Sequence, residues 1–300
     1  MITATALRAG PALVLDGGLS TALEEDGADL TDDLWTARLL LDEPHRVRAV
    51  HERFFRAGAD VATTATYQAS VPSLVDAGVP EREAVDLLGR GVRVARDAAQ
   101  AVAAETGRTL LVAASVGPYG AVLADGSEYR GRYGLTAAQL RDFHAPRLEL
   151  LAAAGPDLLA VETIPDVDEA EVLIALLDEL GVPAWLSYSV ADGRTRAGQS
   201  LADAFAVAAR SSALVAAGVN CCAPDDVLTA ITVAHSVTGM PTVAYPNRGE
   251  EWDAERKQWG GGGAFDPALA ATWVAAGCRL VGGCCRVGTQ DLRELAHAMR

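Results

Sequence analysis

Four of the five cysteines in this 300-residue chain lie in two adjacent pairs, Cys221-Cys222 and Cys284-Cys285. Each pair ends a short apolar run, so the fold can bring thiols from two distant segments together. Three thiolates, from Cys221, Cys284 and Cys285, would suit a catalytic Zn²⁺ site, because zinc favours sulfur and a catalytic ion keeps one position open. The sequence lacks the C-x2-C pairs of most structural zinc sites. From spacing alone, a metal site and buried core thiols both remain open.

The adjacent pair sets a geometric condition on such a site. Neighbours in a regular strand point to opposite faces, so Cys284 and Cys285 can reach one ion only if the pleat breaks. Gly282-Gly283, directly before them, makes that break cheap. A disulfide between adjacent cysteines would be strained, which disfavours redox pairing. For Cys222 and Cys278 we expect the role of a small buried hydrophobe.

Eight short apolar runs must position these residues. They are continuous rather than alternating, as is typical of parallel strands buried on both faces. The expected strands are 12–16, 60–64, 110–115, 157–162, 184–189, 214–220, 242–245 and 280–284. Amphipathic helical patterns separate them, at 44–57, 83–103, 137–153, 169–180, 201–209, 224–237, 267–276 and 289–298. The alternation predicts an α/β fold, with residues 1–300 forming a single (β/α)8 TIM barrel domain; a doubly wound sheet is the alternative.

The early repeats are longer than the later ones, which predicts long early βα loops over the mouth of the barrel. The last residues of the strands converge on that face. They are Asp16, Thr64, Ser115, Glu162, Ser189, Cys221, Tyr245 and Cys284. Two carboxylates would therefore lie near the cysteines. The alternative is that Asp16 serves the Gly17-Gly18 turn and that Glu162 caps a helix.

Composition excludes several classes of function. The net charge of −15 disfavours nucleic acid and anionic membrane surfaces as partners. The only lysine, Lys257, lies in a polar stretch near glycines, which argues against Schiff-base chemistry. No apolar run is long enough to span a bilayer, and the N-terminal segment does not read as a signal peptide. With an odd number of cysteines, a reducing cytoplasmic location is expected.

The sequence resembles the homocysteine S-methyltransferases, most closely the short enzymes that use S-methylmethionine. The motifs that carry the resemblance are Leu15-Asp-Gly-Gly-Leu-Ser-Thr21, Gly58-Ala-Asp, Ala65-Thr-Tyr-Gln-Ala69, Ser115-Val-Gly-Pro-Tyr-Gly120, Leu123-Ala-Asp-Gly-Ser-Glu-Tyr-Arg-Gly131, Gly218-Val-Asn-Cys221, Tyr245-Pro-Asn247 and Gly282-Gly-Cys-Cys285. The resemblance implies a (β/α)8 barrel, which agrees with the strand count.

The resemblance also implies the chemistry. Cys221, Cys284 and Cys285 would bind Zn²⁺, and Asp16 and Glu162 would hold the amino group of homocysteine. The enzyme would move a methyl group from a sulfonium donor, S-methylmethionine first and S-adenosylmethionine second, to the homocysteine thiolate to form methionine. Its partners would be these small molecules. None of the five histidines ends an expected strand, so we expect packing or surface roles for them.

Several alternatives remain open at this stage. The same zinc-thiol chemistry could use another donor, such as a betaine or a corrinoid carried by another protein, or a thiol or selenol acceptor. A non-catalytic zinc-binding barrel would not need two carboxylates at the metal. A phosphate-binding barrel built on Gly282-Gly283 would leave the cysteines unexplained. Tyr67, Tyr119 and Tyr129 in the early loops could line a donor pocket, and the loop from Trp252 to Gly263 could close over substrate.

Overall fold

Eight parallel strands form one sheet in the computed structural model, which describes residues 2–31, 34–253, 258–260, 263 and 265–299. The strands are β1 (Leu13–Val14), β2 (Val61–Thr63), β3 (Leu111–Val116), β4 (Leu158–Ile164), β5 (Ala184–Tyr188), β8 (Leu214–Asn220), β9 (Thr242–Tyr245) and β12 (Cys278–Val281). They pair in the order β1-β12-β9-β8-β5-β4-β3-β2. A parallel bridge between Leu15 and Val61 joins the two edges, so the sheet closes into the predicted barrel rather than a doubly wound sheet.

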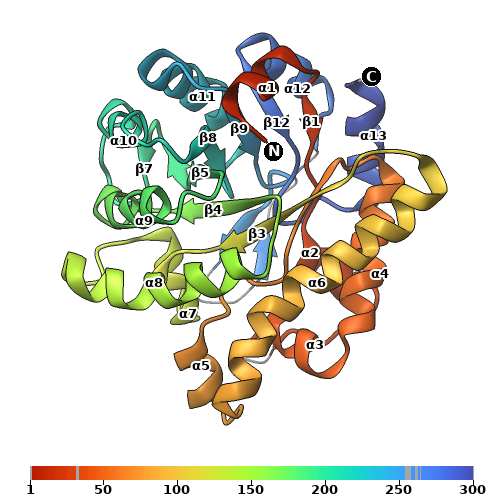
Figure 1. The fold of residues 1–300 in the computed structure, drawn as a ribbon. Helices are drawn as coiled ribbons and strands as arrows, with labels where there is room; N and C mark the ends of the chain where they lie inside the picture. The colour runs from red at the N-terminus through yellow and green to blue at the C-terminus, as the bar shows by residue number, and fades with distance from the viewer. Residues whose placement is uncertain (1, 32–33, 254–257, 261–262, 264, 300) are drawn as a thin grey trace.

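Helices between the strands surround the sheet (Figure 1). The long ones are α4 (Pro44–Ala57), α6 (Glu81–Thr106), α8 (Ala137–Ala153), α9 (Val167–Leu180), α10 (Leu201–Ala208), α11 (Pro224–Thr238), α12 (Ala268–Ala275) and α13 (Thr289–Ala298). Local signals explain their ends. The side chain of Thr136 accepts from the backbone of Gln139 in a capping box that begins α8, and Gly181 ends α9 with a left-handed φ of 65°.

The long early connections are confirmed, and they carry short helices that the sequence patterns did not predict. These are α2 (Leu19–Glu25), α3 (Thr36–Asp42), α5 (Val71–Asp76), α7 (Tyr119–Val122) and the 3₁₀ turn η1 (Ser127–Tyr129). One further helix, α1 (Ala4–Ala9), precedes the first strand. Two small hairpins also stand outside the barrel sheet: β6 (Val190–Ala191) with β7 (Arg194–Thr195), and β10 (Glu251–Asp253) with β11 (Gln258–Gly260).

The apolar core has two parts, as the pleat of a closed sheet requires. The larger part lies between the strands and the helices. The smaller part fills the inside of the barrel around Trp185, Leu158 and Leu280. Polar groups then take over toward the carboxyl ends of the strands. None of the helices within the described residues has the length and apolar character needed to cross a membrane.

The last strand differs from its predicted bounds of 280–284. β12 begins at Cys278 and ends at Val281, so Gly282 and Gly283 lie beyond the strand. The chain passes very close to β1 there, since a Cβ on Gly282 would lie 2.6 Å from the Cβ of Leu15. Cys284 and Cys285 consequently leave the sheet on an irregular segment, which frees them from strand alternation.

Candidate active site

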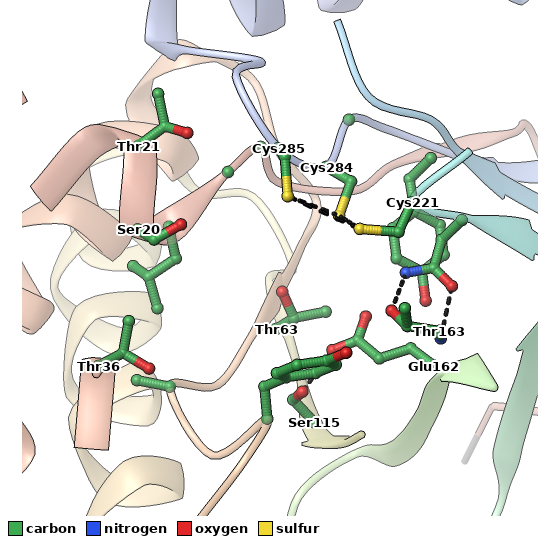
Figure 2. Close-up of a pocket in the computed structure, with 18 of the residues that line it drawn as sticks. Ser20, Thr21, Thr36, Thr63, Ser115, Glu162, Thr163, Cys221, Cys284 and Cys285 are labelled. Atoms are coloured by element: carbon green, nitrogen blue, oxygen red, sulfur yellow. Dashed lines mark hydrogen bonds between the residues drawn. The ribbon is translucent and has the colours of Figure 1, made fainter. Parts of the chain in front are cut away.

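A cavity of about 600 Å³ opens at the carboxyl ends of the strands, where barrels of this kind bind their ligands (Figure 2). Six of the eight predicted strand-end residues line it: Thr64, Ser115, Glu162, Cys221, Tyr245 and Cys284. Cys285 lines it as well. Asp16 and Ser189 do not, although both are buried close by. The early connections complete the wall with residues of α2, α3 and η1.

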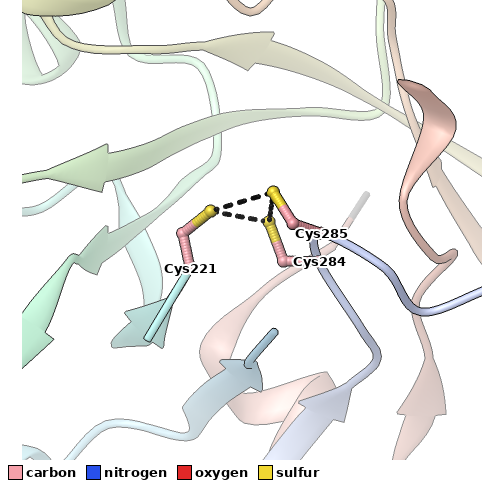
Figure 3. A group of neighbouring side chains, drawn as sticks. All are labelled: Cys221, Cys284 and Cys285. Atoms are coloured by element: carbon pink, nitrogen blue, oxygen red, sulfur yellow. Dashed lines mark hydrogen bonds between the residues drawn. The ribbon is translucent and has the colours of Figure 1, made fainter. Parts of the chain in front are cut away.

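Cys221, Cys284 and Cys285 bring their sulfur atoms together at one wall of this cavity (Figure 3). The Sγ of Cys221 lies 3.0 Å from that of Cys284 and 3.7 Å from that of Cys285, and the last two lie 4.0 Å apart. Tetrahedral zinc with Zn–S bonds of about 2.3 Å needs sulfurs about 3.8 Å apart. Two of the three spacings fit that value, and the third needs a small opening, so this donor set suits a soft divalent ion.

Both cysteine segments break strand geometry to reach the cavity. Cys221 has a positive φ of 50°, so its side chain and that of Asn220 both line the cavity, while Cys222 packs into the outer core. Beyond Gly283, the backbone N–H of Cys284 donates to the carbonyl of Pro246 at 2.8 Å. The predicted break in the pleat is therefore present. Cys278 is fully buried away from the cluster, and its thiol donates to backbone carbonyls.

The three sulfurs are electrostatically linked. Hydrogen bonds from Cys284 and Cys285 hold the pKa of the Cys221 thiol well below its usual value, with a further contact from the Tyr129 hydroxyl at 3.4 Å. The pKa values of Cys284 and Cys285 are raised in turn, first by the interaction with Cys221. Without a cation, only one of the three thiols is favoured to lose its proton, and the resulting Cys221 thiolate accepts hydrogen bonds from the other two thiols. Three thiolates together would require a positive ion among them.

Glu162 faces the sulfur cluster from the end of β4. Its carboxylate accepts a short hydrogen bond from the Ser115 hydroxyl and is also near the Tyr245 hydroxyl. Burial raises the pKa of Glu162 to about 7, against the opposing effect of the Ser115 bond. A buried carboxylate in this state would gain most from a cationic ligand group, because such a group would offset its loss of hydration.

Asp16 lies behind the cavity wall rather than in it. Its two carboxylate oxygens accept hydrogen bonds from the backbone N–H and the hydroxyl of Thr63, at 2.8 and 2.9 Å. Burial raises the pKa of Asp16 to about 8, and the nearby Glu162 charge raises it further. Thr63 itself lines the cavity, so Asp16 is one hydrogen bond away from the lining residues. The predicted contact of Asp16 with substrate stays a prediction.

A pair of residues next to the predicted ones shapes this wall. Thr163 has a φ of 61°, which is unusual for a β-branched residue, and the register of β4 shifts there. As a result, Glu162 and Thr163 both line the cavity, whereas Ile164 packs into the outer core. The Asn220 amide holds the turn: its Oδ1 accepts from the Thr163 N–H at 2.7 Å, and its Nδ2 donates to the Thr163 hydroxyl at 2.8 Å. Asn220 lies in a recognised motif, but nothing in the sequence marks Thr163.

Aromatic rings from the early connections also line the cavity, and one of them, Tyr129, reaches the sulfur cluster. Tyr67 and Tyr129 line it, as considered from the sequence, together with Trp35, which was not predicted. The Trp35 and Tyr67 rings meet edge to face with their centroids 6.3 Å apart. Tyr119 instead packs on Tyr133 and Phe143.

The structure describes only part of the loop from Trp252 to Gly263, which contains Lys257 and which the sequence predicts could close over substrate. Lys257 and residues 261–262 of the predicted mobile loop lie outside the described residues, so the role of that loop as a lid stays untested. The flanking residues form the β10–β11 hairpin.

The sequence matches the family model for homocysteine S-methyltransferase over residues 13–299. The chain belongs to this family. A homocysteine S-methyltransferase from Escherichia coli is 43% identical, with 94% of each chain covered, and homocysteine S-methyltransferase 1 from Zea mays is 42% identical over 98% of this chain and 96% of its own. Family membership makes the protein a methyltransferase, and the resemblance inferred from the motifs is confirmed.

Solved structures of the family agree with the fold. The metallated form of the homocysteine methyltransferase MmuM from Escherichia coli superposes with a TM-score of 0.88 at 40% identity, with 98% of each chain covered. The chain is also similar to a protein named selenocysteine Se-methyltransferase from Brassica oleracea, 39% identical over 94% of this chain and 87% of its own.

Proposed function

We propose that this homocysteine S-methyltransferase is zinc-dependent and takes its methyl group from a sulfonium compound, with S-methylmethionine as the foremost donor. The observation that carries the proposal is the cluster of Cys221, Cys284 and Cys285, whose sulfurs lie on one cavity wall within reach of a single ion. A relative of known structure is described as metallated, which supports a metal in this chain as well.

Cys221, Cys284 and Cys285 would hold Zn²⁺ at the cavity wall. Zinc at this place would supply the chemistry that a free thiol lacks, since a thiol bound to it loses its proton at neutral pH. No histidine lines the cavity among the residues that the structure describes, and the transfer needs no proton donor of its own. The cysteine cluster thus fixes where the substrate sulfur must lie.

Glu162 would bind the ammonium group of homocysteine. Its carboxylate faces the cysteines across the cavity and is held by Ser115, and within the described part of the chain it forms no ion pair, although the Arg147 charge acts on it from a longer distance. Asp16, whose carboxyl group is held by Thr63 next to this wall, would be the second acidic partner of the ammonium group, which would stabilise its ionised form. Together they place the amino group away from the sulfur, so that the substrate chain spans the gap between them.

The donor would approach from the aromatic side of the cavity, where Trp35, Tyr67 and Tyr129 present π-systems that attract cations. The lone pair of the homocysteine thiolate forms the new S–CH₃ bond. The electron pair of the breaking S–CH₃ bond stays on the donor sulfur, which leaves as a neutral thioether. Orientation and a deprotonated acceptor are therefore the two contributions that the protein must make.

Metal content and methyl transfer measured on the same preparation test this function. We expect one zinc per chain, methionine formation from homocysteine with S-methylmethionine, and loss of both after chelation with recovery on adding zinc. Zinc without methyl transfer to any acceptor would favour a non-catalytic zinc-binding barrel. Activity that survives complete removal of metal would refute the zinc proposal.

A selenol acceptor is a second candidate, because a relative of similar length is named for that activity. Selenocysteine and homocysteine would use the same cysteine cluster, but selenocysteine is one carbon shorter between its amino group and its reacting atom. Comparing kcat/KM for the two acceptors with one donor decides between them. A preference for homocysteine is expected if Glu162 and the sulfur cluster are spaced for the longer chain.

A further inference from the structure

Glu128 is a carboxylate in the cavity that the functions assigned so far do not use. It belongs to the 3₁₀ turn η1 in the third βα connection, and it lines the cavity together with Tyr129. Its Oε2 is inaccessible to solvent and makes no hydrogen bond in the part of the chain that the structure describes. A buried acceptor without a donor is costly, and because this one belongs to a residue that lines the cavity, a bound ligand could supply its missing partner.

The surroundings of Glu128 place it near the reacting end of the cavity. The hydroxyl of Tyr129, the next residue, lies 3.4 Å from the Cys221 Sγ. Burial raises the pKa of the Tyr67 hydroxyl, and the Glu128 charge adds to that rise. Burial likewise raises the pKa of Glu128 to about 7, with a smaller contribution from the Cys221 charge. Glu128 thus lies close enough to Tyr67 and Cys221 to interact electrostatically with both.

No cation of the protein neutralises this carboxylate among the described residues. The neighbouring arginine, Arg130, instead donates to the Ser127 hydroxyl at 2.7 Å. Arg196 stacks on the Tyr129 ring, with its guanidinium carbon 5.6 Å from the ring centroid. The cavity therefore combines an unneutralised carboxylate with aromatic rings beside the sulfur cluster.

We propose that Glu128 binds the positively charged sulfonium of the methyl donor, an inference that rests on the proposed function. A sulfonium carries a full positive charge but no N–H or O–H. A carboxylate oxygen that no hydrogen-bond donor reaches suits such a group, and Tyr67 and Tyr129 offer aromatic surface to its methyl groups. The location beside Cys221 favours the sulfonium over the ammonium of the same donor, because the sulfonium must lie next to the acceptor sulfur.

This role predicts a particular kinetic signature. The donor sulfur is cationic before transfer and neutral afterwards, so its attraction to Glu128 weakens along the reaction. The carboxylate then contributes to donor binding and not to the barrier. We expect Glu128→Gln to raise the KM for S-methylmethionine at least tenfold, with kcat unchanged or higher and the KM for homocysteine unchanged.

Binding in the absence of homocysteine separates this proposal from the proposed function, since no transfer can then occur. Three probes are compared by calorimetry on the zinc-loaded protein: S-methylmethionine, trimethylsulfonium and methionine. Glu128→Gln should weaken the first two at least tenfold and leave methionine unaffected. Asp125→Asn is the matched control, because it removes one charge from the same loop at an exposed position that interacts with Ser127. It should change none of the three affinities.

Each other outcome has a definite meaning. Weaker binding of S-methylmethionine and methionine, with trimethylsulfonium unaffected, would assign Glu128 to the ammonium group and overturn the proposal. Unchanged affinities for all three probes, or no sulfonium binding by the wild-type protein, would overturn it too. A third outcome separates the two proposals. If the wild-type protein binds the sulfonium probes but transfers no methyl group, and Glu128→Gln loses that binding, the Glu128 site is supported and the proposed function is refuted.

Discussion

Replacing Glu162 by Gln tests the proposed homocysteine site most directly. Gln has nearly the same volume, and its Oε1 can still accept the hydrogen bond from Ser115, so the wall of the cavity is preserved. The variant lacks the negative charge that the substrate ammonium would meet. A hydrogen bond to a charged group contributes about 1.5–3 kcal/mol, which corresponds to a roughly 10- to 150-fold rise in the KM for homocysteine.

The assay measures methionine formation at varied homocysteine and saturating donor, with zinc content and Tm on the same samples. The pKa of Glu162 near 7 adds a second readout. Below that pH the carboxylate takes up a proton and can no longer pair with an ammonium, so the wild-type KM should rise by about tenfold per pH unit relative to Glu162→Gln. Wild-type and variant KM values that agree across pH 6–8 would remove Glu162 from homocysteine binding.

Three further predictions follow from the geometry. Cys284→Ala should lose bound metal and methyl transfer together, whereas Cys278→Ala should keep both and lose only about 1–2 kcal/mol of stability; elemental analysis and turnover distinguish the two. Burial raises the pKa of Asp16 from 3.8 to about 8, so the folded state binds a proton more tightly than the unfolded state. The stability gained from this is complete below pH 3.8 and is lost as the pH rises through 8; the Tm of metal-free protein should therefore fall more from pH 5 to 8 in the wild type than in Asp16→Asn. Arg147→Met should lower the free energy of unfolding by about 2 kcal/mol and raise the KM for the donor, because the buried Arg147 guanidinium donates to the backbone carbonyls of Thr66 and Tyr67. An unchanged donor KM would show that Arg147 does not position Tyr67 for the donor.

The barrel was predictable because its strands carry a strong signal. Parallel strands buried on both faces need continuous apolar runs, and all eight runs became strands of one sheet. Helices 44–57, 137–153 and 289–298 match their predicted bounds. The predicted end of the last strand was wrong. The apolar run continues through the two glycines after Val281, but the backbone leaves the sheet at that point.

The short helices over the mouth were not predictable in the same way. α2, α3 and α5 have six or seven residues, which is too few for an apolar periodicity to stand out from a loop. They hold Trp35 and much of the cavity wall in place, and their positions depend on packing against distant parts of the chain. The sequence therefore predicts the face of the barrel on which the cavity lies, but not the residues of the early connections that line the cavity.

The reacting residues themselves were predictable to the level of strand ends, but their orientation was not. Cys221 and Glu162 were expected at the mouth because they end strands, and they are there. Asp16 also ends a strand, but each of its oxygens accepts a hydrogen bond from Thr63, and its contact with substrate stays a prediction. The sequence pattern predicts which side chains reach this face of the barrel. It does not predict which hydrogen bonds those side chains form with neighbouring strands.

The ends of β4 and β8 show how this barrel overcomes the limit that alternation sets on a site. A regular strand offers only every second side chain to the inside. Left-handed backbone at Thr163 and Cys221 makes two successive side chains face the cavity from each strand, at a cost of about 1–3 kcal/mol for each strained residue. Asn220 offsets part of that cost through its two bonds to Thr163, and it directly precedes Cys221. One amide therefore connects the two irregular ends and couples the backbone positions of Glu162 and Cys221, while the hydrogen bond from Ser115 orients the Glu162 carboxylate.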